Sequence, residues 1–94
     1  MPPSKVIIAA TAEKQLVKVP YFIRDKLYHW VERVEEFGIN EIRRIKGFHD
    51  EPLVGTRYGQ RSIRLNRSYR AIYIETSSQE LILIKIIEVT NHEY

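Results

Sequence analysis

Five arginines between residues 57 and 70 form the densest group of side chains suited to binding an anion. No acid lies among them. The rest of the chain has 10 basic and 12 acidic residues, so the positive net charge of +3 comes from this segment. Arginine offers planar, bidentate donors that fit phosphate oxygens. A face closed by surface ion pairs is the competing interpretation, and the lack of local acids favours phosphate binding. The arginines are Arg57, Arg61, Arg64, Arg67 and Arg70.

Two further segments carry groups that can move protons. His49, Asp50 and Glu51 are adjacent to one another, and Asn91-His92-Glu93-Tyr94 closes the sequence. Histidine titrates near neutral pH, and a neighbouring carboxylate or phenol can orient it or share its work. Each segment also has a plain structural interpretation, the first as a polar loop and the second as a frayed terminus.

Together these three groups meet the minimum for cleaving RNA without a metal. A base must take the proton of the 2′-hydroxyl, a cation must stabilise the charged phosphorane, and an acid must protonate the departing 5′-oxygen. Tyr58, Tyr69 and Tyr73 could stack on bases, although aromatic residues in strands more often lie in a core. His29 falls within an amphipathic helix, where we expect a structural role.

The elements that must position these residues begin with helices. Apolar residues recur at spacings of three and four from residue 23 to residue 37, which predicts a helix with one buried stripe that starts near Pro20 and ends before Gly38. A shorter helix is expected over about residues 12–18, with Thr11 as its N-cap. A short strand could precede it at residues 5–9, and a third helical piece is expected within residues 39–46. The stripe consists of Ile23, Leu27, Trp30, Val31, Val34 and Phe37.

The segment from residue 47 to residue 59 is expected to be a long loop. It contains three of the four glycines and Pro52. Long loops in small domains are functional candidates. The spacing of the five arginines would also fit one face of a helix, but Gly55 and Gly59 interrupt that segment and favour strands after it.

The remainder of the chain alternates as strands do. Ser62, Arg64 and Asn66 alternate with apolar residues, so we expect them to share an open face of a sheet whose other face packs on the helices. Residues 66–68 predict a tight turn and residues 69–75 a second strand. Residues 81–90 are apolar on both faces, which predicts a central strand. Helices followed by an antiparallel meander indicate a single α+β domain over residues 1–94.

The composition and the missing motifs exclude several classes of protein. Because there is no cysteine, a disulfide scaffold, a thiolate metal site and cysteine catalysis are excluded. No apolar run approaches the ~20 residues that span a bilayer. We expect no secretory leader and a cytoplasmic location. There is no P-loop, GxGxxG or HExxH pattern, so neither a nucleotide cofactor nor a metal is expected.

Four stretches, taken in their order and spacing, resemble motifs of the RelE/ParE toxin superfamily. The likeness is strongest to toxins of the HigB and YoeB types, and it covers about half of the chain, from residue 47 onward. The stretches are Gly47–Leu53 (GFHDEPL), Gly59–Asn66 (GQRSIRLN), Tyr69–Tyr73 (YRAIY) and Glu88–Tyr94 (EVTNHEY).

The resemblance implies both a fold and an activity. The fold is two N-terminal helices packed on a twisted antiparallel sheet of about four strands. The activity is cleavage of mRNA in the ribosomal A site by metal-free attack of the 2′-hydroxyl. Glu51 is similar to a carboxylate that acts as the general base, Arg70 to the arginine that contacts the scissile phosphate, and Arg64 to a further arginine of the sheet.

The C-terminal motif departs from the pattern that it resembles. His92 and Tyr94 are similar to a histidine and a tyrosine that transfer protons or stack on a base, but Glu93 separates two residues that are adjacent in YoeB-type tails. Which of the two is the acid therefore stays open, and His49 could share the role of base with Glu51.

The expected function is that of a ribosome-dependent mRNA endoribonuclease toxin of a type II toxin–antitoxin pair. Its expected partners are a cognate antitoxin, the ribosome and mRNA. The alternative is an inhibitor of DNA gyrase of the ParE type, which shares the fold and needs no catalytic residues. The catalytic candidates are Glu51, Arg64, Arg70, His92 and Tyr94, and the further side chains expected to contact RNA are Arg57, Arg61, Arg67 and His49.

Overall fold

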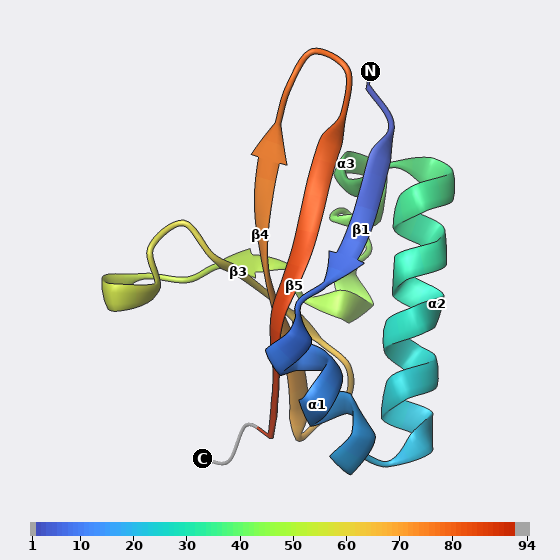
Figure 1. Cartoon of the computed structure of the whole chain (residues 1–94), viewed down its shortest axis with the longest axis vertical. Helices are drawn as coiled ribbons and strands as arrows, with labels where there is room; N and C mark the ends of the chain where they lie inside the picture. Colours follow the sequence, from blue (N-terminus) through green and yellow to red (C-terminus); the bar gives the residue numbers. More distant parts are fainter. Residues whose placement is uncertain (1, 92–94) are drawn as a thin grey trace.

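The computed structural model describes residues 2–91 of the 94-residue chain, which form an α+β fold (Figure 1). In chain order the elements are β1 (Ser4–Ile8), α1 (Ala10–Lys18), α2 (Tyr21–Phe37), α3 (Ile39–Ile42), the 3₁₀ turn η1 (Lys46–Phe48), β2 (Glu51–Pro52), the 3₁₀ turn η2 (Gly55–Arg57), β3 (Arg61–Arg64), β4 (Tyr69–Ser77) and β5 (Ile82–Asn91).

The sheet is mixed, and its five strands lie in the order β1-β5-β4-β3-β2. The expectation of about four antiparallel strands is wrong in two respects. β1 pairs parallel with β5, because helices rather than a hairpin turn connect the first strand to the rest of the sheet. The two-residue β2 pairs with β3 at the opposite edge and is too short to leave a periodic signal. β5 has a neighbour on each side, which confirms that residues 81–90 contain an internal strand.

The long helix α2 lies along β1 (Figure 1) and buries the predicted stripe against the sheet. Ile23, Leu27, Trp30 and Val34 are each at most 1% exposed. The ring of Trp30 lies 5.4 Å from the ring of Tyr73 on β4, measured between centroids. This contact joins the helix to the middle strand of the sheet.

The ends of the helices differ in part from the expected ones. α2 ends before Gly38, as predicted, and Gly38 has a φ of 90°. Phe37 was expected in the buried stripe but is 55% exposed, because the chain turns at Gly38 and Ile39 of α3 takes the buried position instead. Thr11 is not an N-cap, since α1 already begins at Ala10 and has no side-chain cap.

A β-bulge in β5 decides which of its side chains face the helices. Ile72 pairs with Glu88 while Tyr73 pairs with Ile86, so Ile87 is an extra residue between them. A bulge reverses the alternation of side chains along a strand. Ile86 and Val89 are therefore both buried on the helix side although they are three positions apart. The same reversal puts Glu88 on the opposite, open face.

No helix within residues 2–91 is long and apolar enough to cross a membrane.

Candidate active site

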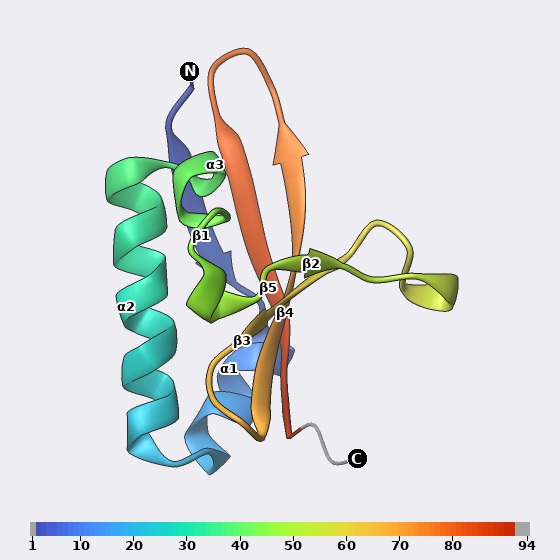
Figure 2. The same cartoon turned by 180° about the vertical axis from the view of Figure 1, so that it is seen from behind.

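A pocket of about 380 Å³ opens on the face of the sheet that points away from the helices. Its walls come from β2, the loop after it, β3, β4 and β5. The loop that carries η2 projects from the body of the molecule beside this face (Figure 2). The polar side chains that line the pocket are Glu51, Arg57, Ser62, Arg70, Glu88 and Thr90.

Arg70 is the central cation of this pocket. Its Nη1 donates a hydrogen bond of 2.7 Å to Ser62 Oγ and lies 3.6 Å from Glu51 Oε1. The Arg70 side chain is 15% exposed, whereas that of Glu51 is 59% exposed. The structure thus brings two predicted catalytic residues together, with a fixed cation beside an accessible carboxylate. Such a pair can stabilise phosphorane charge and accept a hydroxyl proton.

A second ion pair borders the same pocket. Arg57 Nη2 donates to Glu88 Oε1 at 2.7 Å, and Arg57 Nη1 donates to Gln60 Oε1 at 2.9 Å. Glu88 was not among the predicted site residues. Its signal in the sequence was the break in alternation between Ile86 and Val89, which marks the bulge that turns Glu88 toward the pocket.

Although residues 57–70 contain no acid, most of their arginines are in ion pairs with acids in the folded chain. Acids from outside the segment reach three of the five: Glu88 is paired with Arg57, Asp50 with Arg61 and Glu51 with Arg70. The inference that a salt-bridged face needs acids nearby in the sequence was wrong, because strand pairing brings distant residues side by side.

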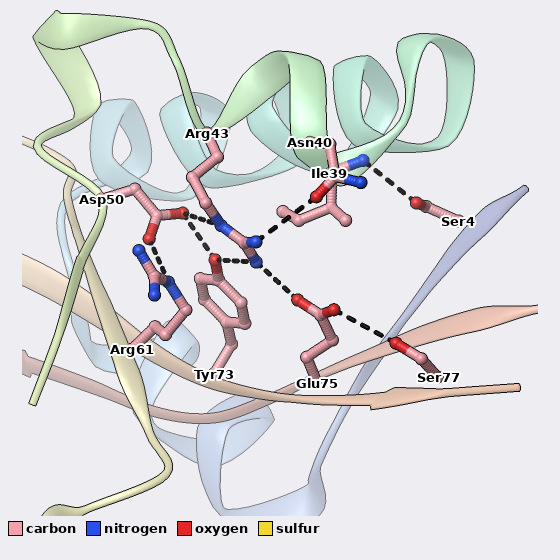
Figure 3. Close-up of polar contacts among 9 residues, drawn as sticks. All are labelled: Ser4, Ile39, Asn40, Arg43, Asp50, Arg61, Tyr73, Glu75 and Ser77. Carbon is pink, nitrogen blue, oxygen red and sulfur yellow. Dashed lines mark hydrogen bonds and ion pairs between the residues drawn. The ribbon is translucent and has the colours of Figure 1, made fainter. Parts of the chain in front are cut away.

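Arg61 lies on the opposite side of the sheet from Arg70. It faces the helices, where its Nε donates to Asp50 Oδ1 at 2.7 Å (Figure 3). The Asp50 side chain is only 1% exposed. The position of Arg61 argues against its expected contact with RNA and makes it a structural partner of Asp50.

The contacts of Asp50 extend into a network of hydrogen bonds and ion pairs behind the sheet (Figure 3). Tyr73 OH donates to Asp50 Oδ2 at 2.5 Å, and Arg43 Nη2 donates to Tyr73 OH at 3.1 Å and to Glu75 Oε1 at 2.5 Å. Burial, followed by the hydrogen bond to Asp50, raises the pKa of Tyr73. Burial alone would lower the pKa of Arg43, but its hydrogen bonds to Glu75 and Tyr73 outweigh it and raise that pKa. Near neutral pH, Tyr73 thus stays a neutral donor and Arg43 a cation.

Arg64, Arg67 and His49 lie beside the pocket rather than in it. Arg64 and Arg67 line a neighbouring hollow of about 480 Å³ together with Lys26. Arg64 Nη1 lies 3.4 Å from His49 Nε2, and both residues are exposed. Within residues 2–91, neither Arg64 nor Arg67 is in an ion pair with an acid.

Ser62 and Asn66 depart from the open polar face that was expected of them. Ser62 is on the predicted side, but it is 1% exposed and bonded to Arg70. Asn66 lies beyond the end of β3, and its Oδ1 accepts bonds from the backbone N–H groups of Ser68 and Tyr69. These bonds form the turn that was predicted over residues 66–68.

The predicted C-terminal residues His92 and Tyr94 lie outside the described residues. The last described residue, Asn91, pairs with Tyr69, and Thr90 beside it pairs with Arg70 and lines the pocket. Within residues 2–91, no group of three His, Asp or Glu side chains is arranged to hold a metal ion.

No protein-family model and no curated protein sequence matches this chain. Its fold, however, matches solved structures of bacterial toxins. A YoeB/ParE toxin from Agrobacterium tumefaciens is 16% identical and has a TM-score of 0.69, with 95% of this chain and 99% of that one covered. YafQ from E. coli is 13% identical with the same TM-score, over 94% of this chain and 92% of that one. At these identities, the likeness is one of fold.

The fold also matches structures that contain an antitoxin. One chain in the structure of the RelBE2 toxin–antitoxin complex from Mycobacterium tuberculosis is 21% identical to this chain. Its TM-score is 0.67, over 97% of this chain and 99% of that one. One chain in the YoeB–YefM complex from Staphylococcus aureus is 18% identical, with a TM-score of 0.64 over 96% of this chain and 97% of that one.

Proposed function

This chain has the fold of the RelE/ParE toxins, and we propose that it is the toxin of a type II toxin–antitoxin pair that cleaves mRNA on the ribosome. The observation that carries the proposal is the Arg70–Glu51 pair, at 3.6 Å on the open face of the sheet. Fold alone does not define function, but this pair joins an accessible carboxylate to a cation, which can supply the base and the charge stabilisation that metal-free cleavage of RNA needs.

The proposed reaction breaks the bond from phosphorus to the 5′-oxygen. Glu51 takes the proton of the 2′-hydroxyl, whose oxygen attacks the phosphorus, and Arg70 stabilises the charge on the phosphorane oxygens. His92 or Tyr94 returns a proton to the leaving 5′-oxygen, so the products are a 2′,3′-cyclic phosphate and a 5′-hydroxyl. His49 is a second candidate for the base, and Arg57, Arg64 and Arg67 contact the RNA backbone around the pocket.

We propose that an antitoxin neutralises the chain, since an active toxin must be held inactive until it is needed. Structures with the same fold contain antitoxins, such as DinJ bound to YafQ in E. coli. The proposed mode is a segment of the antitoxin that covers the arginine face or displaces the C-terminal tail.

The function is tested by inducing the wild type and the variants Glu51→Ala, Arg70→Ala and His92→Ala in cells and mapping mRNA 5′ ends. We expect cuts in phase with codons in the wild type that disappear in these variants. The matched control is Glu80→Ala, an exposed acid in the turn before β5, which should cut like the wild type. Intact mRNA together with impaired gyrase supercoiling would instead establish the alternative function, inhibition of DNA gyrase.

A further inference from the structure

The backbone around Glu51 has little support of its own. β2 has only two residues, and the second of them, Pro52, has no N–H to donate. The backbone bond from Leu53 N to Gln60 O, at 2.9 Å, holds the chain after the strand. Within residues 2–91, the one polar contact of the Glu51 side chain is the 3.6 Å approach to Arg70. A carboxylate held this loosely needs another anchor to stay in reach of the cation.

The residue before Glu51 supplies that anchor. The Asp50 side chain is 1% exposed on the helix side of the sheet, where it meets Arg61 and Tyr73 (Figure 3). Arg43 Nε lies 3.9 Å from Asp50 Oδ2, which makes a longer ion-pair contact without a hydrogen bond. Two of these partners lie on β3 and β4 and one follows α3, so Asp50 ties the loop to three parts of the fold.

Adjacent residues of an extended chain point to opposite faces of a sheet. Asp50 points behind the sheet, and Glu51 points to the pocket in front of it. Fixing the Asp50 side chain therefore fixes the direction in which Glu51 leaves the backbone. His49, with a φ of 45°, makes the turn that brings the chain into this position.

We propose that Asp50 is a positioning residue that holds Glu51 opposite Arg70 through its buried contacts with Arg61 and Tyr73. The catalytic part of this inference rests on the proposed function, whereas the positioning itself is a property of the fold. A buried carboxylate is costly to desolvate and is stable only when paired. Packed apolar residues in place of Asp50 and its partners together would satisfy this site for stability alone, but they would not set the direction of the loop.

A double-mutant cycle tests whether Asp50 acts through Glu51. Asp50→Asn keeps the shape of the side chain and removes its charge. We expect it to slow single-turnover cleavage of mRNA on programmed ribosomes by about tenfold or more, because a reacting group displaced by ~1 Å can lower the rate by about 10²-fold. In the Glu51→Ala background the same change should alter the residual rate by less than about twofold. Equal losses in both backgrounds would overturn the inference, since a general weakening of the fold acts in both.

Two further variants keep the cycle informative. Tyr73→Phe removes one hydrogen bond from Asp50 and leaves the ion pair with Arg61, so it tests the same link if Asp50→Asn does not fold. Glu75→Gln is the matched control, because it alters the bond to Arg43 at the far end of the network and leaves both bonds of Asp50 in place. We expect Glu75→Gln to cleave at the rate of the wild type.

Amide hydrogen exchange tests the positioning without any activity. In Asp50→Asn the N–H of Leu53 should exchange faster, while the amides that join β4 to β5 keep the protection of the wild type. Unchanged protection at Leu53 would overturn the inference. If the wild type does not cleave mRNA, the proposed function fails and hydrogen exchange alone decides whether Asp50 holds the loop.

Discussion

Arg70 is held by contacts that leave its charge available at the pocket. One Nη atom bonds to Ser62, and the neighbouring acid, Glu51, is 3.6 Å away and mostly exposed. We expect Arg70→Ala to lower single-turnover cleavage by about 10²-fold or more, since charge stabilisation of this kind is worth ~3 kcal/mol. Arg70→Lys should recover only part of the rate, because it keeps the charge and loses the planar fork. Cleavage by Arg70→Ala at the wild-type rate would contradict the role given to this residue.

Arg61 and Arg64 have the same side chain but lie on opposite faces of β3. Arg61→Ala removes the closer of the two ion-pair partners of the buried Asp50 carboxylate and leaves the distant Arg43 Nε, and we expect it to lower the free energy of unfolding by about 3 kcal/mol. Arg64→Ala should stay within about 0.5 kcal/mol of the wild type, because Arg64 is exposed and its polar contact is with His49. Urea unfolding of the two variants measures the difference, and equal stability would show that the face assignment is wrong.

At the scale of elements, the strongest periodic signals predicted the structure well. The three- and four-residue spacing from Ile23 to Val34 identified α2, and Gly38 identified its end. Alternation and turn residues identified β4, the turn at Asn66 and the internal strand β5. These signals are local, and each one depends on residues within a few positions of one another.

The elements that the sequence did not reveal depend on distant partners. The direction of β1 depends on its pairing with β5, more than seventy positions away, and no local pattern records it. Two residues of β2 are too few to show a period. The partners of the pocket arginines were hidden for the same reason, since Glu88 reaches Arg57 only because Ile87 makes a bulge. The proposed catalytic roles of Glu51 and Arg70 were inferred from a family resemblance, and spacing alone did not predict the geometry of this pair.

Gly38 connects α2 to α3, and its backbone conformation predicts how a substitution there affects stability. Its φ of 90° and ψ of 148° lie in a region that only glycine adopts readily. A Cβ at Gly38 would meet no atom within 4 Å, so the effect of Gly38→Ala is backbone strain alone. We expect a loss of about 1–3 kcal/mol in urea unfolding. Gly47→Ala is the matched control, since Gly47 also has open space and no positive φ. Equal stability of the two variants would refute the strain argument.

At the scale of the whole molecule, the network of Arg43, Asp50, Arg61, Tyr73 and Glu75 behind the sheet makes the free energy of unfolding depend on pH in the alkaline range. The pKa of Tyr73 is raised above its ordinary value of 10.0 in the fold, so the unfolded chain loses this proton first. The contribution of Tyr73 is complete below pH 10 and declines as the pH rises above it, by up to about 1.4 kcal/mol per unit. Urea unfolding at pH 9, 10 and 11 should show a steeper decline for the wild type than for Tyr73→Phe. Equal slopes would show that Tyr73 does not contribute.

The distribution of charge over the molecule predicts how RNA binding responds to salt. Three of the five clustered arginines are paired with acids, which leaves Arg64 and Arg67 as the exposed cations of that segment. Each phosphate contact by a cation steepens the dependence of log K on log salt by about 0.7 for a single strand. We therefore expect Arg64→Ala with Arg67→Ala to flatten the slope by about 1.4, measured by anisotropy with a labelled RNA oligonucleotide. Arg61→Ala should keep the wild-type slope, because its guanidinium faces Asp50 behind the sheet. If Arg61→Ala flattened the slope as much as the double variant, the five arginines would act as one surface, contrary to the two faces seen in the structure.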